Sequence, residues 1–140
     1  MPYVLDTDIV SALQNKHPHV VARVANLPRS ELFFTIVSFE EQCSGRLNVL
    51  NRPLNAVKLV EAYDRLRETL LFYTIVTVLP YDDAAARIEA DLRVLLRRMG
   101  TKDRRIAAIT LSHGYTLVTR NTIDFEAVPG LAPLENWVDA

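Results

Sequence analysis

The heptapeptide VLDTDIV at residues 4–10 joins a short apolar run to two acids, Asp6 and Asp8. The apolar residues from Tyr3 onward are typical of a short buried strand, and those after Asp6 have the spacing of a helix that Thr7 can cap. An acid at the end of a buried strand can be the nucleophile of a phosphoryl-transfer enzyme or a ligand for a metal ion. Aspartate is also among the best helix N-cap residues, so capping is the structural alternative for both acids.

Along the whole chain, short β-like runs alternate with longer helical patterns. The runs expected to form strands lie at residues 3–5, 32–37, 73–79 and 115–119, and residues 131–134 can add a short fifth strand. The helices between them include one that Ser38 would cap and a long amphipathic one at 54–71. Strands that alternate with helices are joined by right-handed crossovers. The sequence therefore predicts a single-domain, three-layer α/β fold over residues 1–140, with a mainly parallel sheet of four to five strands and helices on both faces.

Length and composition are those of one ordinary globular domain. The chain has 140 residues, 49% of them hydrophobic and 24% charged, and a net charge of −1 that gives no indication of a partner. No apolar stretch approaches the roughly 20 residues that a membrane span requires, so we expect a cytoplasmic protein without a membrane segment. The single cysteine, Cys43, cannot form an intramolecular disulfide, and its helical spacing with apolar residues predicts a place in the core.

Four acids from separate segments lie where expected strands end or where the helix before the last strand begins: Asp6, Glu41, Asp103 and Asp124. Because the carboxyl ends of parallel strands meet at one edge of the sheet, we expect these acids to converge there. Each acid alone also has a structural explanation, as a helix cap, a capping-box residue, a favourable charge at a helix N-terminus or a solvated loop side chain. Gathered carboxylates repel each other, so a fold that brings them together must neutralise them with a cation or with protons.

The residue types favour a hard divalent cation at this edge. Mg²⁺ and Mn²⁺ prefer oxygen ligands, and carboxylates supply them. The three histidines, His17, His19 and His113, lie in a polar turn or at a helix end, so we interpret them as surface or boundary residues. A histidine-based ribonuclease or a serine–histidine hydrolase therefore has little support.

Four segments together resemble the PIN-domain family, and specifically its VapC-type toxins, the nuclease half of type II toxin–antitoxin modules. The segments are VLDTDIVSAL from residue 4, TIVSFEEQCSGRL from residue 35, GTKDRRIAAITLSHGYTLVTRN from residue 100 and DFEAVPGLAPLENW from residue 124. The resemblance is most specific from Gly100 to Trp137 and least specific in the long helix at 54–71. It implies a PIN-like version of the α/β fold predicted above.

The resemblance also implies roles for individual residues. Asp6, Glu41 and Asp103 match the acidic metal ligands of the family. Many family members place a further aspartate directly after the last strand, where this sequence has Asn121 and supplies Asp124 three residues later. Asn121 adds no negative charge, which bears on whether a second metal ion binds. The expected catalytic residues are Asp6, Glu41, Asp103, Asn121 and Asp124.

Contacts to an RNA substrate are expected from polar and basic residues near these acids. The expected substrate-binding residues are Thr7, Thr119, Arg104, Arg105 and Arg120. Lys102 extends the basic cluster, as do Arg97 and Arg98 at the end of the preceding helix. Cations at a helix end also complement its dipole, so Arg97 and Arg98 have an equally good structural explanation.

The resemblance implies a Mg²⁺-dependent endoribonuclease, with Mn²⁺ as a substitute, that is the toxin of a type II toxin–antitoxin module. It further implies an RNA substrate, a cognate antitoxin protein and a homodimer. Asn121 leaves one alternative open, a PIN-like interaction module with weakened catalysis. The run DTDIV also resembles the first motif of haloacid-dehalogenase-type phosphatases, but the chain lacks the lysine and the further acid pair which that family needs in set contexts.

Overall fold

The computed structural model describes residues 2–139, which form helices around one parallel sheet. The strands are β1 (Tyr3–Leu5), β2 (Leu32–Thr35), β3 (Val78–Leu79) and β4 (Thr116–Val118). The helices are α1 (Thr7–Gln14), α2 (Pro18–Ala25), α3 (Ile36–Leu50), α4 (Ala56–Ile75), α5 (Asp83–Leu95), α6 (Thr101–His113) and α7 (Thr122–Glu126), and a 3₁₀ turn spans Arg29–Glu31. The predicted α/β class is confirmed.

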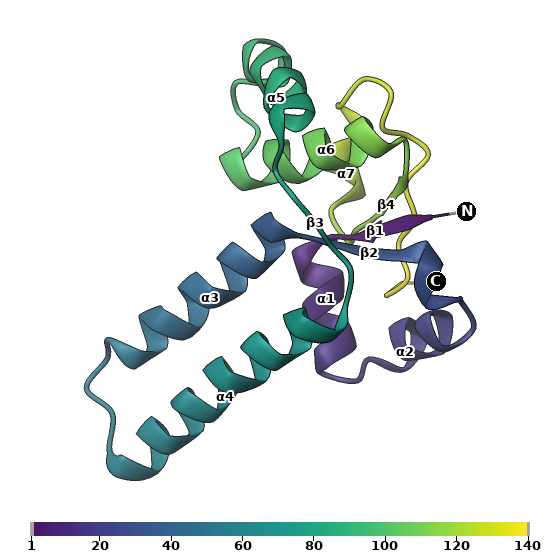
Figure 1. Ribbon diagram of the computed structural model, residues 1–140. Helices are drawn as coiled ribbons and strands as arrows, with labels where there is room; N and C mark the ends of the chain where they lie inside the picture. Colours follow the sequence, from purple (N-terminus) through teal and green to yellow (C-terminus); the bar gives the residue numbers. More distant parts are fainter. Residues whose placement is uncertain (1, 140) are drawn as a thin grey trace.

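The sheet has the strand order β3-β2-β1-β4 with all pairs parallel, which places the carboxyl ends of the strands at one edge (Figure 1). Side chains alternate between the two faces, as the strand period of two requires. Val4 and Leu117 lie in a core with α5, α6 and α7, whereas Leu5 and Val118 lie in a core with α1, α2 and the end of α4. Helices therefore cover both faces of the sheet, as the sequence predicts.

The first two strands pass directly into helices, with caps that differ from those predicted. Thr35 caps α3 in place of Ser38, because the Thr35 hydroxyl accepts a hydrogen bond from the backbone N–H of Ser38 at 3.0 Å. The strand predicted at 32–37 accordingly ends at Thr35. Asp6 caps α1 in place of Thr7, as the structural alternative for this acid has it, since its carboxylate accepts a hydrogen bond from the Thr7 backbone N–H. A helix N-terminus thus follows each of these strand ends at once.

The segment predicted as a strand at 73–79 is mostly helical. α4 runs through Ile75 and leaves only 2 residues for β3. The ring of Tyr73 packs edge-on against Phe39, with centroids 5.0 Å apart, and its hydroxyl donates to Gln42 Oε1 at 2.8 Å. Tertiary packing of this kind overrides the β-branched composition of the segment.

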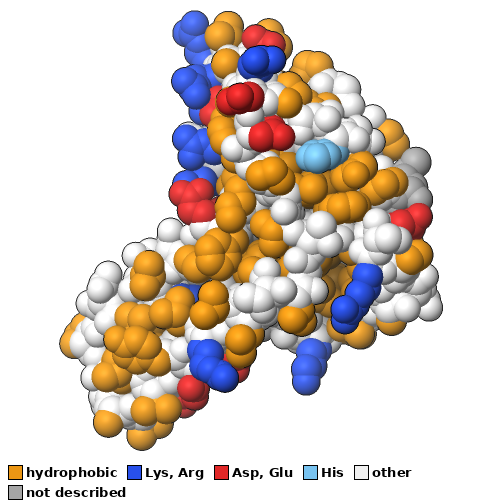
Figure 2. Space-filling view, in the orientation of Figure 1, with side chains coloured by type: hydrophobic (Ala, Val, Ile, Leu, Met, Phe, Trp, Pro, Cys, Tyr) orange, Lys and Arg blue, Asp and Glu red, His pale blue; other side chains and the backbone are white. Residues whose placement is uncertain are grey.

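Helices α3 and α4 pack against each other as an arm that projects from the sheet (Figure 1). Figure 2 shows orange apolar side chains gathered along this arm, and the exposed apolar residues of α4 include Val57, Val60, Tyr63, Leu70 and Ile75. Cys43 lies on α3 and is only partly buried, so the core position predicted for it is wrong. Among the described helices, none is both long and apolar enough to cross a membrane.

The C-terminal residues extend the sheet beside β4. Val118 and Glu135 form a single parallel bridge, so the fifth strand predicted at 131–134 is reduced to one pairing just after it. Trp137 is buried, and its ring lies edge-on to Tyr3 with centroids 5.2 Å apart. The C-terminal segment therefore packs against the first strand of the chain.

The short helix α7 was not expected from the sequence. Phe125 is fully buried in the core shared with α5 and α6, whereas Ile123 on the same helix is 81% exposed. Asp124 lies between them in the first turn of α7. Burial of Phe125 therefore holds the helix that carries one of the predicted catalytic acids.

We expect Phe125→Ala to lower the free energy of unfolding by about 3–5 kcal/mol, because it removes a large side chain from a packed core. Ile123→Ala is the matched control on the same helix and should change the value by no more than about 0.5 kcal/mol. Urea denaturation followed by circular dichroism measures both. Equal losses in the two variants would contradict the anchoring role of Phe125.

Candidate active site

Asp6 lies at the carboxyl end of β1 and is only 5% exposed. One of its carboxylate oxygens accepts the backbone N–H of Thr7 at 2.8 Å, and the other accepts the hydroxyl of Thr119 at 2.8 Å. The pKa of Asp6 is raised to about 7, chiefly because burial disfavours the charged form and also because Asp8 lies nearby. The two hydrogen bonds oppose this rise without cancelling it.

Thr7 connects the ends of the first two strands. Its hydroxyl donates to Glu41 Oε1 at 2.7 Å and lies 2.8 Å from the hydroxyl of Ser38. Glu41, on the second turn of α3, is thereby held next to the N-terminus of α1. The structure gives Thr7 a positioning contact inside the site, in addition to the substrate contact predicted for it.

Asp103 brings a third segment to the same place from the first turn of α6. Partial burial raises its pKa, and repulsion from Glu41, Asp124 and Asp8 adds to the rise. These neighbours belong to α3, α7 and α1, respectively. The four predicted acids therefore converge at the carboxyl edge of the sheet, together with a fifth.

Asp8 is the member of the cluster that was not predicted from the sequence as a site residue. Its Oδ2 accepts the backbone N–H of Arg120 at 3.1 Å, while its Oδ1 is buried and has no hydrogen-bond partner among residues 2–139. Burial raises the pKa of Asp8, and the charge of Glu41 contributes. The spacing Asp-x-Asp was the signal that could have identified it, because the residue two positions after an N-cap lies in the first helical turn.

Asn121 and Asp124 occupy the region where the family pattern and this sequence differ. The side-chain amide of Asn121 donates to Asp124 Oδ2 at 2.9 Å, and its backbone N–H donates to the Thr119 hydroxyl at 3.0 Å. Since Thr119 donates to Asp6, a chain of hydrogen bonds runs from the end of β4 to the buried acid. Asp124 is exposed and lies at the rim of the cluster.

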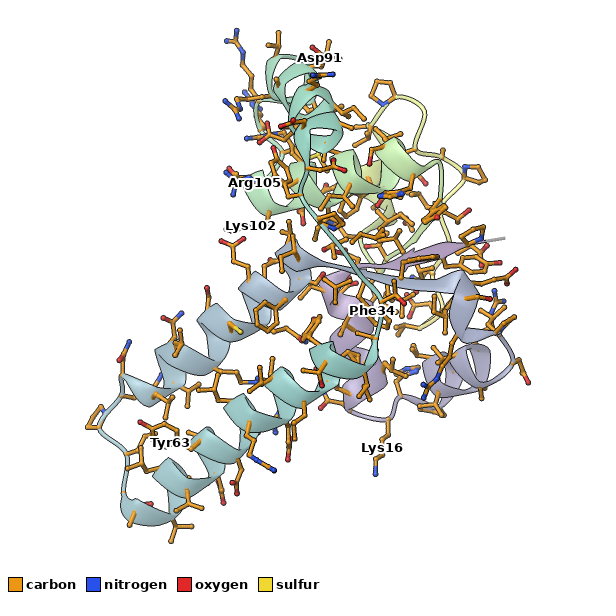
Figure 3. The ribbon with its side chains drawn as sticks, in the orientation of Figure 1. Lys16, Phe34, Tyr63, Asp91, Lys102 and Arg105 are labelled. Carbon is orange, nitrogen blue, oxygen red and sulfur yellow. The ribbon has the colours of Figure 1, made fainter. Side chains whose placement is uncertain are left out.

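Three basic residues of α6 are engaged within the protein. Arg104 is buried, and its guanidinium donates to a backbone carbonyl in the preceding loop, which leaves little of its side chain exposed for the RNA contact predicted for it. Arg105 lies 3.6 Å from the fully buried carboxylate of Glu89, and Lys102 pairs with Glu40 on α3. Figure 3 shows Lys102 and Arg105 on the same side of α6 near its start. The side chain of Arg105 is thus shared between a structural ion pair and solvent.

Arg120 differs from these three residues. It is exposed, and its charge lowers the pKa of Asp8 in opposition to burial. Its side chain has no ion pair within 4.0 Å in the part of the chain that the structure describes. Of the three arginines predicted to contact substrate, Arg120 has the side chain most available to it.

The chemistry of the cluster fits a hard divalent cation. The side chains supply carboxylate oxygens, burial and mutual repulsion raise the pKa of Asp6, Asp8 and Asp103, and a cation would relieve that repulsion. The unpartnered Oδ1 of Asp8 is a further free oxygen. Within residues 2–139, however, no three His, Cys, Asp or Glu side chains are already grouped as ligands of one ion. A bound cation would therefore have to draw the carboxylates closer together.

The chain is thus an α/β protein with an acidic cluster at the carboxyl edge of a parallel sheet, which is the edge where open α/β sheets generally bind their ligands. The chain belongs to the PIN-domain family, whose family model matches residues 3–131. The match includes every acid of the cluster, from Asp6 to Asp124.

Relatives of similar length carry ribonuclease and toxin names. The chain is 30% identical over 142 residues to the tRNA(fMet)-specific endonuclease VapC of Salmonella typhimurium, with 98% of each chain covered. It is 30% identical over 139 residues to Ribonuclease VapC1 of Rickettsia felis, with 96% of each covered. Toxin FitB of Neisseria gonorrhoeae is 28% identical and matches 97% of this chain and 99% of its own.

Solved structures of the same family share the fold over nearly the whole chain. DNA-bound VapBC from Salmonella typhimurium superposes with a TM-score of 0.79 at 27% identity, covering 98% of both chains. FitAcB from Neisseria gonorrhoeae superposes with a TM-score of 0.69 at 26% identity, covering 96% of both. The PIN-like fold and the resemblance to VapC-type proteins that the sequence indicates are therefore confirmed.

The buried charge of Asp6 predicts a pH-dependent stability of the metal-free protein. The folded state keeps the Asp6 proton up to a pKa of about 7, whereas the unfolded chain loses it near the ordinary value of 3.8. The folded state therefore binds more protons between these values, so stability falls as pH rises through this window. In EDTA at pH 8, we expect Asp6→Asn to be more stable than the wild type by about 1–2 kcal/mol.

Asparagine is also a good N-cap, so Asp6→Asn leaves α1 intact and isolates the effect of charge. The stability difference should shrink between pH 8 and pH 5, and thermal unfolding at both values measures it. A difference that stays constant over this range would show that the buried charge of Asp6 does not destabilise the fold. Asp64→Asn, an exposed site on α4, serves as the control.

Proposed function

We propose that this protein is a Mg²⁺-dependent endoribonuclease and the toxin of a type II toxin–antitoxin module. The observation that carries the proposal is the convergence of Asp6, Asp8, Glu41 and Asp103 at the carboxyl edge of the sheet, in a chain of the PIN-domain family. Five carboxylates, with Asp124, exceed what helix capping requires, because only Asp6 among them caps a helix. The similarity to proteins named as VapC ribonucleases supports RNA as the substrate.

Asp6, Glu41 and Asp103 are the residues proposed to hold the cation, and Asp8 is added to them because its Oδ1 is buried and has no partner among the described residues. When bound, Mg²⁺ would supply positive charge that polarises a phosphodiester and stabilises negative charge on the attacking and leaving oxygens. Mn²⁺ has the same preference for oxygen ligands and can substitute for it.

The remaining residues of the site hold these carboxylates in place. Thr119 donates to Asp6 and Thr7 donates to Glu41, so the two hydroxyls fix the orientation of acids in two different segments. Asn121 orients Thr119 through its backbone N–H and Asp124 through its amide. Arg120 and the solvent-facing part of Arg105 are proposed to contact the RNA backbone by charge.

The same proposal includes a protein partner. Solved structures similar to this chain are described as VapBC and FitAcB, and another is described as a member of the VapBC family of toxin–antitoxin systems. We therefore infer a cognate antitoxin for this chain, and the resemblance to the VapC group adds a homodimer. A cytoplasmic location follows from an RNA substrate and from an antitoxin made in the same cell.

The proposal predicts metal-dependent cleavage of RNA by purified protein freed of antitoxin. A panel of structured RNAs should be cut in Mg²⁺ and left intact in EDTA. Asp6→Asn and Asp103→Asn should each lower the rate by at least about 100-fold, since loss of a ligand exceeds the roughly 10–100-fold effect of a change outside the ligand set. Asp64→Asn should cleave at the wild-type rate, because its exposed carboxylate lies on the α4 arm.

Two results would contradict the proposal. Cleavage that persists in both site variants would indicate a contaminating nuclease, and absence of cleavage by folded protein across the panel would favour the interaction module. In the second case Asn121→Asp is the informative variant, because it restores an acid directly after β4. Cleavage gained by that variant would show that the asparagine had weakened catalysis.

A further inference from the structure

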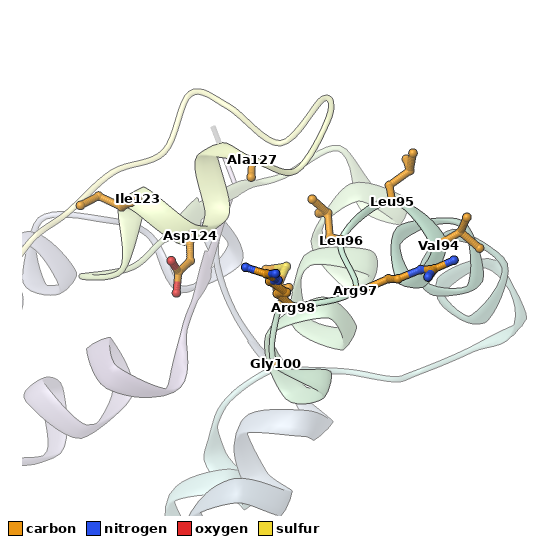
Figure 4. Close-up of a pocket in the computed structure, with 10 residues that line it drawn as sticks. Val94, Leu95, Leu96, Arg97, Arg98, Gly100, Ile123, Asp124 and Ala127 are labelled. Atoms are coloured by element: carbon orange, nitrogen blue, oxygen red, sulfur yellow. The ribbon is translucent and has the colours of Figure 1, made fainter.

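A cleft of about 530 Å³ lies between the end of α5, the segment that leads into α6, and α7 (Figure 4). This volume is within the range of pockets that hold small organic ligands. The cleft lies beside the acidic cluster and is not made of its ligand residues. Asp124 at its edge is the only acid of the cluster among its lining residues.

Exposed apolar side chains form one part of the cleft wall. Val94 is 69% exposed, Leu95 is 65% exposed and Ile123 is 81% exposed. Leu96 and Ala127 extend the apolar surface. Aliphatic side chains around a concave surface can remove the apolar face of a nucleobase from water.

Two arginines form the other part of the wall. Arg97 and Arg98 are exposed, and neither lies within 4.0 Å of an acid among the described residues. Figure 4 shows Arg98 extending toward the wall that carries Asp124. The neighbouring Lys102 and Arg105, by contrast, are paired with Glu40 and Glu89. The exposed arginines near the site that have no ion pair among the described residues are therefore Arg120, at the end of β4, and the two on the cleft.

The cleft opens directly onto the acidic cluster. Gly100 lines the cleft, and a Cβ at Gly100 would lie 3.6 Å from Asp103 Oδ2. On the opposite wall, Asp124 is hydrogen-bonded to Asn121 at the end of β4. A chain whose phosphate lay at the cluster would therefore place its next nucleotide at the mouth of the cleft.

We propose that this cleft is a nucleotide subsite, which binds one unpaired nucleotide of single-stranded RNA adjacent to the phosphodiester at the acidic cluster. The base contacts the apolar wall, and Arg97 and Arg98 contact the neighbouring phosphates. The proposal rests on the proposed function and specifies its substrate as RNA with an unstacked base next to the cleaved bond. A polyanion is favoured over a protein segment because the apolar wall is flanked by two guanidinium groups that pair with no acid in residues 2–139.

The test measures binding and cleavage separately. Binding of a fluorescein-labelled pentanucleotide of single-stranded RNA to the Asp103→Asn protein in Mg²⁺ is followed by anisotropy, and the measurement is repeated with single abasic sites at successive positions. One abasic position should weaken binding about tenfold, as expected when one base no longer buries its face against the apolar wall. Ala127→Trp, which fills the cleft, should weaken binding of the intact oligonucleotide about tenfold and remove the abasic effect.

Matched controls separate the cleft from the general surface. Ala25→Trp on α2 and Arg67→Ala on α4 place the same changes at exposed positions away from the cleft and should bind as the parent does. Joint replacement of Arg97 and Arg98 by alanine should weaken all oligonucleotides alike and reduce the salt dependence of binding. If Ala127→Trp fails to fold, Ile123→Ser tests the same wall at a largely exposed position.

A flat abasic scan, or unchanged binding in a folded Ala127→Trp protein, would overturn the subsite. The subsite would also be overturned if Ala127→Trp changed the oligomeric state of the protein without changing its RNA affinity. The cleft would then be a protein interface. Failure of the nuclease proposal gives a different result, in which no RNA is cleaved by the wild type. A position-specific abasic effect in that case still supports the cleft as an RNA-binding site.

Discussion

Mutual repulsion of carboxylates is the constraint on which the architecture depends. Parallel strands deliver their carboxyl ends to one edge, and here that edge receives acids from α1, α3, α6 and α7. Burial disfavours the charged form of Asp6 and repulsion from Asp8 adds to this, which is why the pKa of Asp6 is raised to about 7. The cluster persists because the two cores, on opposite faces of the sheet, fix the positions of the helices that carry the acids. This packing holds the carboxylates together against their mutual repulsion.

Neutral hydroxyl groups make this crowding tolerable. Thr7, the first residue of α1, donates to Glu41, and Thr119, which follows β4, donates to Asp6. Each of these two acids therefore accepts a hydrogen bond from a different segment of the chain. The opposite arrangement is found at Glu89, where two arginines offset one buried carboxylate. Charge is thus neutralised internally at Glu89 and left unneutralised at the sheet edge. That contrast supports the proposal that an external cation binds at the edge.

The strand-end acids could be predicted from the sequence because parallel topology follows from the alternation of short apolar runs and helical patterns. Asp6, Glu41 and Asp103 come together as that reasoning requires. Features that depend on packing were not accessible in this way. Tyr73 is helical because its ring and hydroxyl are satisfied against α3, and Arg104 turns inward because a backbone carbonyl lies within its reach. α7 escaped prediction because a five-residue helix has too little periodicity to detect.

Strands β1 and β4 lie side by side in the sheet although more than a hundred residues separate them in the chain. Asp6 therefore lacks Thr119, its hydrogen-bond donor, until synthesis of the chain is nearly complete. Contacts of such long sequence separation form late in folding because the loop between them must be closed first. An N-terminal fragment on the ribosome would carry the first acids without the strand that orients them. The acidic centre is therefore assembled only after β4 has been synthesised and has paired with β1.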